Sequence, residues 1–389
     1  MEWNLRKVYV MSNVNVKLAT YDFVKKGEHI YFCSFRHSKL FRFNLENKSC
    51  EMVGAFDDEV NEDLYISVVE YEERIVFVPE KASRIAVYDM GKKSIDFITF
   101  EKPKGNHKER YENAILFRGG FSYGQYVYLL GFGYPGIIKI DMTTYDLVYI
   151  NDWVGEVERH INEGDYYGYF SCGVCIEKGT AIIPLGCMKG VIKIDLKTDA
   201  TKVIEIDVPS RAVGGITYFN DSYFVVPRGE SEFIKSIYVF DEQLKSIKKV
   251  IALPSENESY TREDPFRELI IYGDALYLLP ISANNIYKIE KDTYALTRIE
   301  KIKFESPISR GDQPRVMAAK IVDNHFIMID QYLKWYDWDL AKDEIDSFEC
   351  ITGEDTVRDD NIRLIKDKNS IIHEERMSLG EYIAALTHM

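Results

Sequence analysis

The sequence predicts an all-β fold, a single seven-bladed β-propeller of four-stranded blades. Seven apolar runs each end in a bulky apolar residue followed by Asn, Asp or Glu, and regular spacing of this size is typical of propeller blades. Each interval contains four short segments rich in Val, Ile, Tyr and Phe, bounded by turn residues. The marker residues, spaced by 45, 52, 54, 46, 49 and 49 positions, are Asn44, Asp89, Asp141, Asp195, Asp241, Glu290 and Asp339.

The fourth and sixth units illustrate the expected order of strands. Strands are expected at 172–177, 180–185, 191–196 and 202–207 in the fourth unit, and at 269–272, 275–280, 286–290 and 296–302 in the sixth. The marker acid ends the third strand, because its side chain accepts hydrogen bonds from backbone amides two residues further on and so starts a tight turn. Proline cannot donate to a sheet ladder, so the end of the second strand is marked by Pro79, Pro184, Pro227 and Pro280.

The seven units fill residues 16–352 and leave no room for a separate domain. Residues 1–15 contain an expected strand at 7–11, which could pair with the last blade and close the ring. Residues 353–389 are expected to form a hairpin, 362–366 with 370–373, and a helix that starts at a capping box at 378–381. A partial eighth blade made from both termini is the alternative for the ends. The final helix either docks on the ring or binds a partner.

Composition disfavours several classes of partner. The chain of 389 residues has a formal charge of -14, which argues against nucleic acid and acidic membrane surfaces, because binding to phosphate depends on clustered Lys and Arg. The start of the chain lacks a signal-peptide pattern, and no run is long and apolar enough to span a bilayer. The expected location is therefore cytoplasmic.

Cysteines and acidic runs give no sign of a metal or a cofactor. Six cysteines are too few for a disulfide scaffold at this length, so we expect buried free thiols. Cys172 and Cys175 are suggestively spaced, but residues three apart on a strand point to opposite faces. The acidic run at 57–63 lacks the glycine and the terminal spacing of an EF-hand. We predict neither a metal nor a cofactor.

Two third-strand segments resemble a known family. The runs GIIKID at 136–141 and VIKID at 191–195 resemble the repeats of YVTN-type and related bacterial β-propellers. The Trp-Asp endings of WD repeats and the paired glycines of Kelch repeats do not recur. Propellers of the resembling kind include scaffolds, ligand binders, lyases and isomerases, so the resemblance implies an architecture and leaves the activity open.

A propeller sorts its loops onto two faces. The loops from each outer strand to the next inner strand share one face with the loops between the second and third strands; we call it the central face, because it surrounds the channel. Function in such scaffolds usually lies on loops held by a rigid frame. Lysines concentrate in turns of the opposite face, among them Lys25, Lys92, Lys178, Lys197 and Lys245.

Arginines concentrate instead in the loops of the central face. Arginine suits planar, bidentate recognition of carboxylate or phosphate, so we predict that a ring of arginines binds an anionic group. The alternative is ion pairing that fixes the loops, because these loops also carry many acids. Arg211 and Arg315 have the fewest acids close by in the sequence. The predicted ligand-binding arginines are Arg36, Arg84, Arg110, Arg159, Arg211, Arg228, Arg267, Arg310 and Arg315.

Aromatic and histidine residues of the same loops complete the candidate site. Trp153 and Tyr167 either stack on sugars and peptide side chains or pack a long loop down. No HExxH, GxSxG or phosphate-loop motif occurs in the sequence. The first hypothesis is a non-catalytic platform that binds a protein, peptide or glycan through an anionic group. The alternative is a cofactor-independent lyase, isomerase or cyclase with His107 or His160 as its base.

Overall fold

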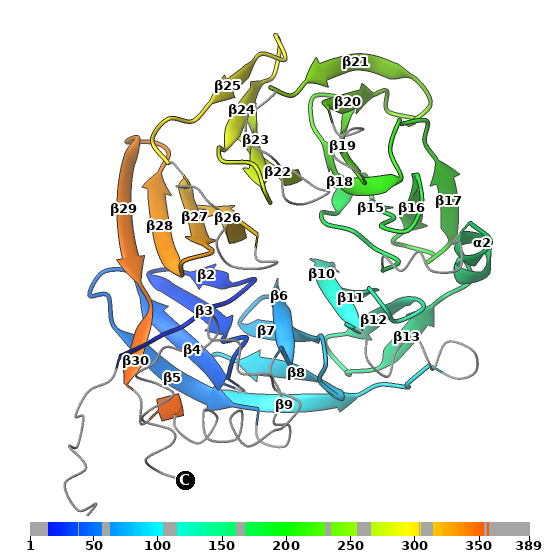
Figure 1. Cartoon of the computed structure of the whole chain (residues 1–389). Helices are drawn as coiled ribbons and strands as arrows, with labels where there is room; N and C mark the ends of the chain where they lie inside the picture. Colours follow the sequence, from blue (N-terminus) through cyan, green and yellow to red (C-terminus); the bar gives the residue numbers. More distant parts are fainter. Residues whose placement is uncertain are drawn as a thin grey trace, which may run out of the picture.

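The computed structural model describes residues 15–37, 39–56, 63–103, 115–160, 168–229, 235–254, 266–302, 304, 314–353 and 356–357. Their strands form seven four-stranded antiparallel sheets, each with its strands in chain order, and one further two-stranded sheet. Figure 1 shows the seven sheets arranged as blades around a common centre, with the first strands innermost. The predicted seven-bladed propeller is confirmed.

The blades follow one another along the chain. Blade 1 is β2 (Val24–Lys26), β3 (His29–Cys33), β4 (Lys39–Asn44) and β5 (Cys50–Ala55). Blade 2 is β6 (Tyr65–Tyr71), β7 (Arg74–Pro79), β8 (Arg84–Asp89) and β9 (Ser94–Thr99). Blade 3 is β10 (Phe117–Tyr123), β11 (Tyr126–Gly131), β12 (Ile137–Asp141) and β13 (Leu147–Ile150). Blade 4 is β14 (Cys175–Glu177), β15 (Thr180–Pro184), β16 (Gly190–Asp195) and β17 (Thr201–Glu205).

The remaining three blades keep the same order. Blade 5 is β18 (Ala212–Tyr218), β19 (Tyr223–Arg228), β20 (Ser236–Phe240) and β21 (Ile247–Ala252). Blade 6 is β22 (Phe266–Tyr272), β23 (Ala275–Pro280), β24 (Tyr287–Glu290) and β25 (Leu296–Arg298). Blade 7 is β26 (Val316–Val322), β27 (His325–Asp330), β28 (Lys334–Asp339) and β29 (Glu344–Glu349). A short helix, α2 (Val154–Glu158), follows blade 3.

The marker acids form the corner after the third strand, as predicted. The Asp195 carboxylate accepts hydrogen bonds from the amides of Lys197 (2.9 Å) and Thr198 (3.0 Å). The Asp339 carboxylate accepts them from Ala341 and Lys342, both at 3.0 Å. The Lys342 side chain, and after it these backbone bonds, stabilise the ionised form and lower the pKa of Asp339 to about 2. The same turn bonds are formed by the side chains of Asn44, Asp89, Asp141 and Asp241, so the repeated Asn or Asp is a turn former.

Blade 4 departs from the predicted strand pattern. The inner strand was expected to begin at Cys172, but β14 begins at Cys175. Cys172 instead forms an isolated parallel bridge with Gly215 of β18, and its amide donates to the Gly214 carbonyl at 3.2 Å. The chain therefore pairs with a strand of the next blade before it enters β14. Cys172 and Cys175 do not lie on one strand, as the sequence had led us to expect. All six cysteines are free.

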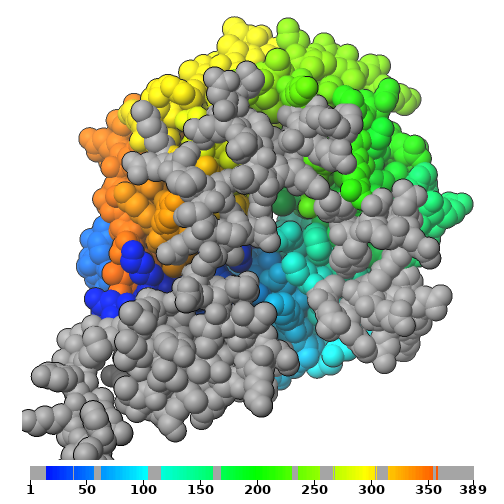
Figure 2. Space-filling model, viewed as in Figure 1, coloured from blue at the N-terminus to red at the C-terminus, as the bar shows by residue number. Residues whose placement is uncertain are grey.

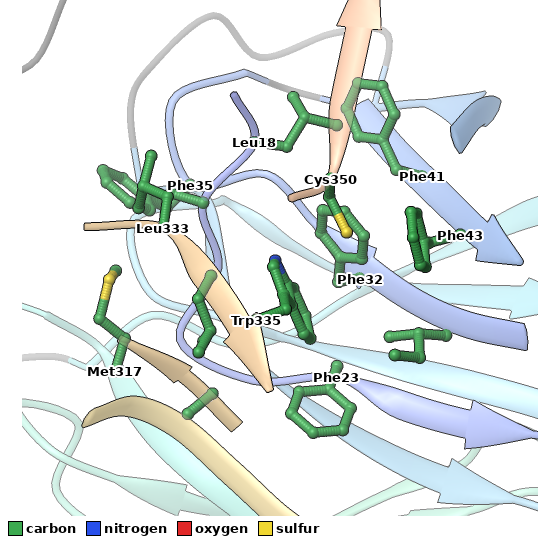
Figure 3. Packing of buried hydrophobic residues seen from close by; sticks show 14 of the residues in the cluster. Leu18, Phe23, Phe32, Phe35, Phe41, Phe43, Met317, Leu333, Trp335 and Cys350 are labelled. Carbon is green, nitrogen blue, oxygen red and sulfur yellow. The ribbon is translucent and has the colours of Figure 1, made fainter. Parts of the chain in front are cut away.

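Large apolar side chains fill the spaces between neighbouring blades. The contact between blades 7 and 1 is rich in aromatic rings (Figure 3). Trp335 of β28 lies 5.4 Å from the ring of Phe23 and 5.6 Å from the ring of Phe32, measured between ring centroids. Phe43 and Phe348 stack at 4.7 Å. Apolar residues of both the first and the last blade therefore form one cluster that closes the ring.

A short pair of strands reinforces this closure. β1 (Asn15–Lys17) pairs antiparallel with β30 (Ile351–Gly353), and the Lys17 and Glu349 side chains form an ion pair at 2.5 Å. The space-filling view shows the blue first blade lying directly against the orange last blade (Figure 2). The expected strand at 7–11, the hairpin at 362–373 and the helix from 378 lie outside the described residues.

Candidate functional site

Backbone hydrogen bonds tie each blade to the next at the central face. In blade 2 the Glu80 amide donates to the Leu64 carbonyl (2.8 Å), and the Glu80 carbonyl accepts the amide of Leu116 (2.7 Å), just ahead of blade 3. The amide of Phe132 then donates to the Leu116 carbonyl (2.8 Å), and that of Tyr169 to the Phe132 carbonyl (2.8 Å). We call this pattern the backbone relay. In blades 1 to 4 it comprises Ala19, Phe35, Asp63, Leu64, Glu80, Leu116, Phe132, Tyr169 and Gly186.

The relay recurs in the later blades and carries arginines there. The Arg315 amide donates to the Ile281 carbonyl (2.8 Å), and the Gln331 amide donates to the Arg315 carbonyl (3.1 Å). In blade 5 the Arg211 amide donates to the Arg228 carbonyl (3.1 Å). The backbone of Arg315 is therefore bonded to both neighbouring blades, whereas the bond between Arg211 and Arg228 lies within blade 5.

Three predicted arginines lie beside one another or beside relay residues. Arg36 follows Phe35 directly, and its guanidinium carbon lies 5.7 Å from the Phe35 ring centroid. Arg211 is exposed. Arg228 ends β19, and its Nη1 atom lies 3.3 Å from where a Cβ on Gly186 would be, so its guanidinium reaches the loop of blade 4. The structure thus brings Arg211 and Arg228 together at the junction of blades 4 and 5.

Arg315 and Gln331 are both buried, with 2% and 4% of their surface exposed. In the part of the chain that the structure describes, neither Nε2 nor Oε1 of Gln331 has a hydrogen-bond partner. A buried amide without partners is rare in native proteins and calls for a physical explanation, such as a bound water or ligand. The predicted Arg315 therefore lies next to a polar group that the sequence did not single out.

Two further predicted residues have local packing contacts. The Arg84 guanidinium lies 4.1 Å from the ring centroid of Phe97, in the outermost strand of its own blade. Trp153 is 2% exposed, and its ring packs 5.7 Å from Tyr169 and 5.0 Å from Phe170. Burial of the indole matches the packing role that the sequence left open for it.

The remaining predicted residues are at the rim or outside the described part. Arg159 and His160 follow α2 and are exposed. The Nε2 atom of His160 lies 3.6 Å from a carboxylate oxygen of Glu205, in the outermost strand of blade 4. Arg267 lies in β22, and its side chain is not described. His107, Arg110, Tyr167 and Arg310 lie outside the described residues.

Among the described residues of the central face, Glu80 is a buried acid with a strongly raised pKa. Its side chain is 5% exposed, and its Oε2 atom has no hydrogen-bond partner among the residues that the structure places. Burial, with a smaller contribution from the Asp63 carboxylate, raises the pKa of Glu80 to about 8. The positive charges of Arg118 and Lys81 oppose that change. Glu80 is therefore mostly protonated at neutral pH.

Arg118 faces the same region from blade 3. It lies in a β-bulge of β10, where the register with β11 shifts between Phe117 and Gly120, and bulges redirect side chains at strand ends. Its guanidinium carbon lies 5.0 Å from the ring centroid of Phe132. A Cβ on Gly168 would lie only 2.3 Å from that ring, so the Gly168 backbone packs directly on it. Arg118 thus contacts Phe132 and lies within electrostatic reach of Glu80.

A cleft of 470 Å³ lies at the edge of blade 3. Its walls are residues 101–103 on one side and α2 on the other, and Tyr134 and Tyr149 line it between them. The two tyrosine hydroxyls fix the Glu101 backbone, one donating to its carbonyl (3.0 Å) and the other accepting from its amide (2.8 Å). The lining residues of the cleft do not include the predicted arginines Arg211, Arg228 and Arg315.

Two classes of site find no support in the described part. It contains no group of three or more His, Cys, Asp or Glu side chains arranged to hold a metal ion. None of its helices is long and apolar enough to cross a membrane.

Sequence reasoning missed Glu80, Arg118 and Gln331. Arg118 was passed over because it lies inside an inner strand and not in a loop. Glu80 carried a usable signal: it follows the strand-ending Pro79, where the relay positions of blades 1, 3 and 6 hold Phe35, Phe132 and Ile281. An acid in that register is the exception.

Comparison with known proteins supports the fold alone. No family model matches the chain, and no curated protein matches it by sequence. A computationally designed protein, Ika8, aligns with a TM-score of 0.53 at 9% identity over 87% of this chain and 89% of the other. A catalytically inactive virginiamycin B lyase from Staphylococcus aureus, solved with quinupristin, gives 0.58 at 12% identity over 82% and 95%. A mitotic checkpoint complex chain gives 0.55 at 8% over 90% and 94%.

Proposed function

We propose that this propeller is a binding platform that recognises an anionic group on a peptide, protein or glycan at its central face. The observation that carries the proposal is that four predicted arginines lie in or next to hydrogen-bonded backbone at the ends of blade strands. Arg36 follows Phe35, Arg211 and Arg228 are joined through their backbones, and Arg315 is bonded on both sides. Arginines that start from fixed backbone lose less conformational freedom on binding, which favours affinity.

Lysines of the opposite face have a different setting, which supports this assignment. Lys92 pairs with the corner acid Asp89 at 3.1 Å, and Lys342 pairs with the corner acid Asp339 at 2.8 Å. Their charge is matched within the same turn, and both ammonium groups remain largely exposed. Such lysines mainly keep a surface soluble.

Binding is better supported than catalysis. Of the two histidines proposed as bases, His160 lies at the rim beside Glu205, and His107 lies outside the described residues. General base catalysis needs the base within hydrogen-bond reach of the substrate. Neither of these two histidines has a recorded contact with a predicted arginine in the described residues; His37, which follows Arg36 directly, is buried and forms a hydrogen bond with the Ser34 hydroxyl at 2.9 Å.

The test compares equal losses of charge on the two faces. Isothermal titration calorimetry of citrate, a Glu-rich peptide and a sulfated disaccharide would be run on the full chain. We expect Arg36→Gln with Arg211→Gln to weaken binding of at least one probe about tenfold, because a hydrogen bond to a charged group contributes about 1.5–3 kcal/mol. The control, Lys197→Gln with Lys245→Gln, removes the same charge from the opposite face. Equal weakening by both pairs would show nonspecific attraction and contradict the proposal.

A further inference from the structure

The cleft at the edge of blade 3 is built mainly by loops of the central face. Residues 101–103 belong to the connection from blade 2 to blade 3, and residues 151–158 to the connection from blade 3 to blade 4. Tyr134 and Pro135 lie between β11 and β12. The cleft volume of 470 Å³ falls within the range of about 300–1,000 Å³ that is typical of small-molecule sites.

Both walls of this cleft are held in place by contacts of their own. Tyr134 is 6% exposed, its ring stacks on Phe117 at 4.7 Å, and its hydroxyl donates to the Glu101 carbonyl at 3.0 Å. The Tyr149 hydroxyl accepts the Glu101 amide at 2.8 Å. The opposite wall, α2, is anchored through two buried valines. A cleft with fixed walls costs little conformational entropy when a ligand binds.

Gly155 keeps the α2 wall free of a side chain. A Cβ at this position would have nothing within 4 Å, so the surrounding structure does not require a glycine there. Glycine weakens a helix relative to alanine, because its backbone loses more freedom on folding. The residue is exposed and lines the cleft. A larger side chain at 155 would therefore project into open space and fill the cleft.

The lining offers both hydrogen-bond donors and acceptors. The Asn151 amide can do both, the Lys102 ammonium donates, and the Glu101 carboxylate accepts. Within the described part of the chain, the side chains of Asn151 and Lys102 form neither a hydrogen bond nor an ion pair. The Tyr149 hydroxyl accepts the Glu101 amide and keeps its own proton to donate. A ligand in the cleft thus meets polar groups of both kinds.

We propose that this cleft binds a neutral saccharide. The hydroxyl groups around a sugar ring both donate and accept, which matches Asn151, Lys102 and Glu101. The apolar C–H face of the sugar ring packs on an aromatic ring, and the half-buried Tyr149 supplies one beside the polar groups. This site goes beyond the proposed function and does not depend on it, because it uses none of the predicted arginines.

The charges of the lining disfavour other small ligands. An anion would meet the carboxylates of Glu101 and Glu158, and a cation would meet the ammonium of Lys102. An apolar ligand would take these groups out of water without replacing their hydrogen bonds, which is unfavourable. A neutral molecule rich in hydroxyl groups replaces the lost water bonds on both walls.

The test titrates the full chain with the methyl glycosides of glucose, galactose, mannose and N-acetylglucosamine, followed by saturation-transfer NMR and calorimetry. We expect saturable binding of at least one of them. Gly155→Trp should weaken that binding at least tenfold by filling the cleft. The matched control is Gly353→Trp in β30, where a Cβ also has nothing within 4 Å, and it should bind like the unmodified chain. Urea unfolding of each variant checks that the fold is retained.

A second substitution keeps the test independent of how tryptophan is tolerated on α2. Asn151→Ala removes a donor and an acceptor from the exposed side of the chain and should weaken the same glycoside about threefold to tenfold. Unchanged affinity in both Gly155→Trp and Asn151→Ala would place the sugar elsewhere and overturn the proposal, as would the absence of binding by all four glycosides. Arg36→Gln with Arg211→Gln should leave glycoside binding unchanged, so failure of this site and failure of the anion site are distinguishable.

Discussion

Glu80→Gln should make the protein more stable, and increasingly so as the pH rises. In the folded chain burial raises the pKa of this carboxyl from 4.5 to about 8. A raised pKa in the folded state favours folding at low pH, where both states are protonated, and stability is lost as the pH rises through the folded pKa. Above pH 4.5 the unfolded chain ionises and the folded chain does not. Each pH unit in this window costs about 1.4 kcal/mol.

The magnitude follows from the width of that window. At pH 7 the carboxyl of the unmodified chain costs roughly 3 kcal/mol relative to pH 4.5, and above pH 8 about 4–5 kcal/mol. Glutamine has nearly the same shape and carries no charge at any pH. The two proteins should therefore match at pH 5, differ by about 3 kcal/mol at pH 7, and differ most above pH 8.

Urea unfolding at pH 5, 6, 7, 8 and 9 measures this difference. The control is Glu344→Gln, a neutral replacement at an exposed position of β29, which should leave the pH profile of the unmodified chain intact. Parallel profiles for Glu80→Gln and the unmodified chain would refute the reasoning, since the carboxyl would then titrate alike in both states. A Glu80→Gln protein that is less stable at pH 5 would show that the carboxyl has a partner that glutamine cannot replace.

Three further predictions concern the frame. Trp335→Ala should cost about 3–5 kcal/mol in urea unfolding, because it empties the aromatic cluster between blades 7 and 1; a loss below 1 kcal/mol would contradict that role. Gly168→Ala should destabilise by about 1–3 kcal/mol through the clash with Phe132, whereas Gly155→Ala, on α2 with nothing within 4 Å, should be neutral or stabilising. The pKa of Asp195 is lowered because its carboxylate accepts hydrogen bonds from the backbone amides of Thr198 and Lys197. Its ionised form therefore stabilises the turn at pH values above the unfolded-state pKa, and this stabilisation is lost as the pH falls through the folded-state pKa. Asp195→Asn should keep the turn and weaken this acid dependence, and an unchanged melting profile between pH 2 and 5 would count against the mechanism.

The architecture was predictable because its signals are local. The Asp195 carboxylate forms its turn by accepting hydrogen bonds from the amides two and three residues further on. Pro79 ends its strand because proline has no backbone N–H to donate to the neighbouring strand. Both effects depend on the identity of one residue, so they recur at the same position of several blades and set the register. The departure at Cys172 has a tertiary cause, since its amide bonds to Gly214 of the next blade. No pattern within the fourth unit contains that information.

The candidate site was less predictable because loop position does not specify what a side chain contacts. Arg84 lies where the register places it, yet its guanidinium stacks on Phe97 in the outermost strand. Arg118 was missed because a β-bulge, which has no sequence marker here, redirects a residue of an inner strand. The sequence sorted arginines by face, but the bulge and the packing of rings decide what each guanidinium contacts.

The backbone relay explains why an acid such as Glu80 can be retained at a position that blades 1, 3 and 6 fill with the apolar residues Phe35, Phe132 and Ile281. Its amide and carbonyl bond to Leu64 and Leu116 whatever the side chain is, so the junction between blades 2 and 3 forms without help from the carboxyl. The cost of burying that carboxyl therefore falls on stability and leaves the architecture unchanged.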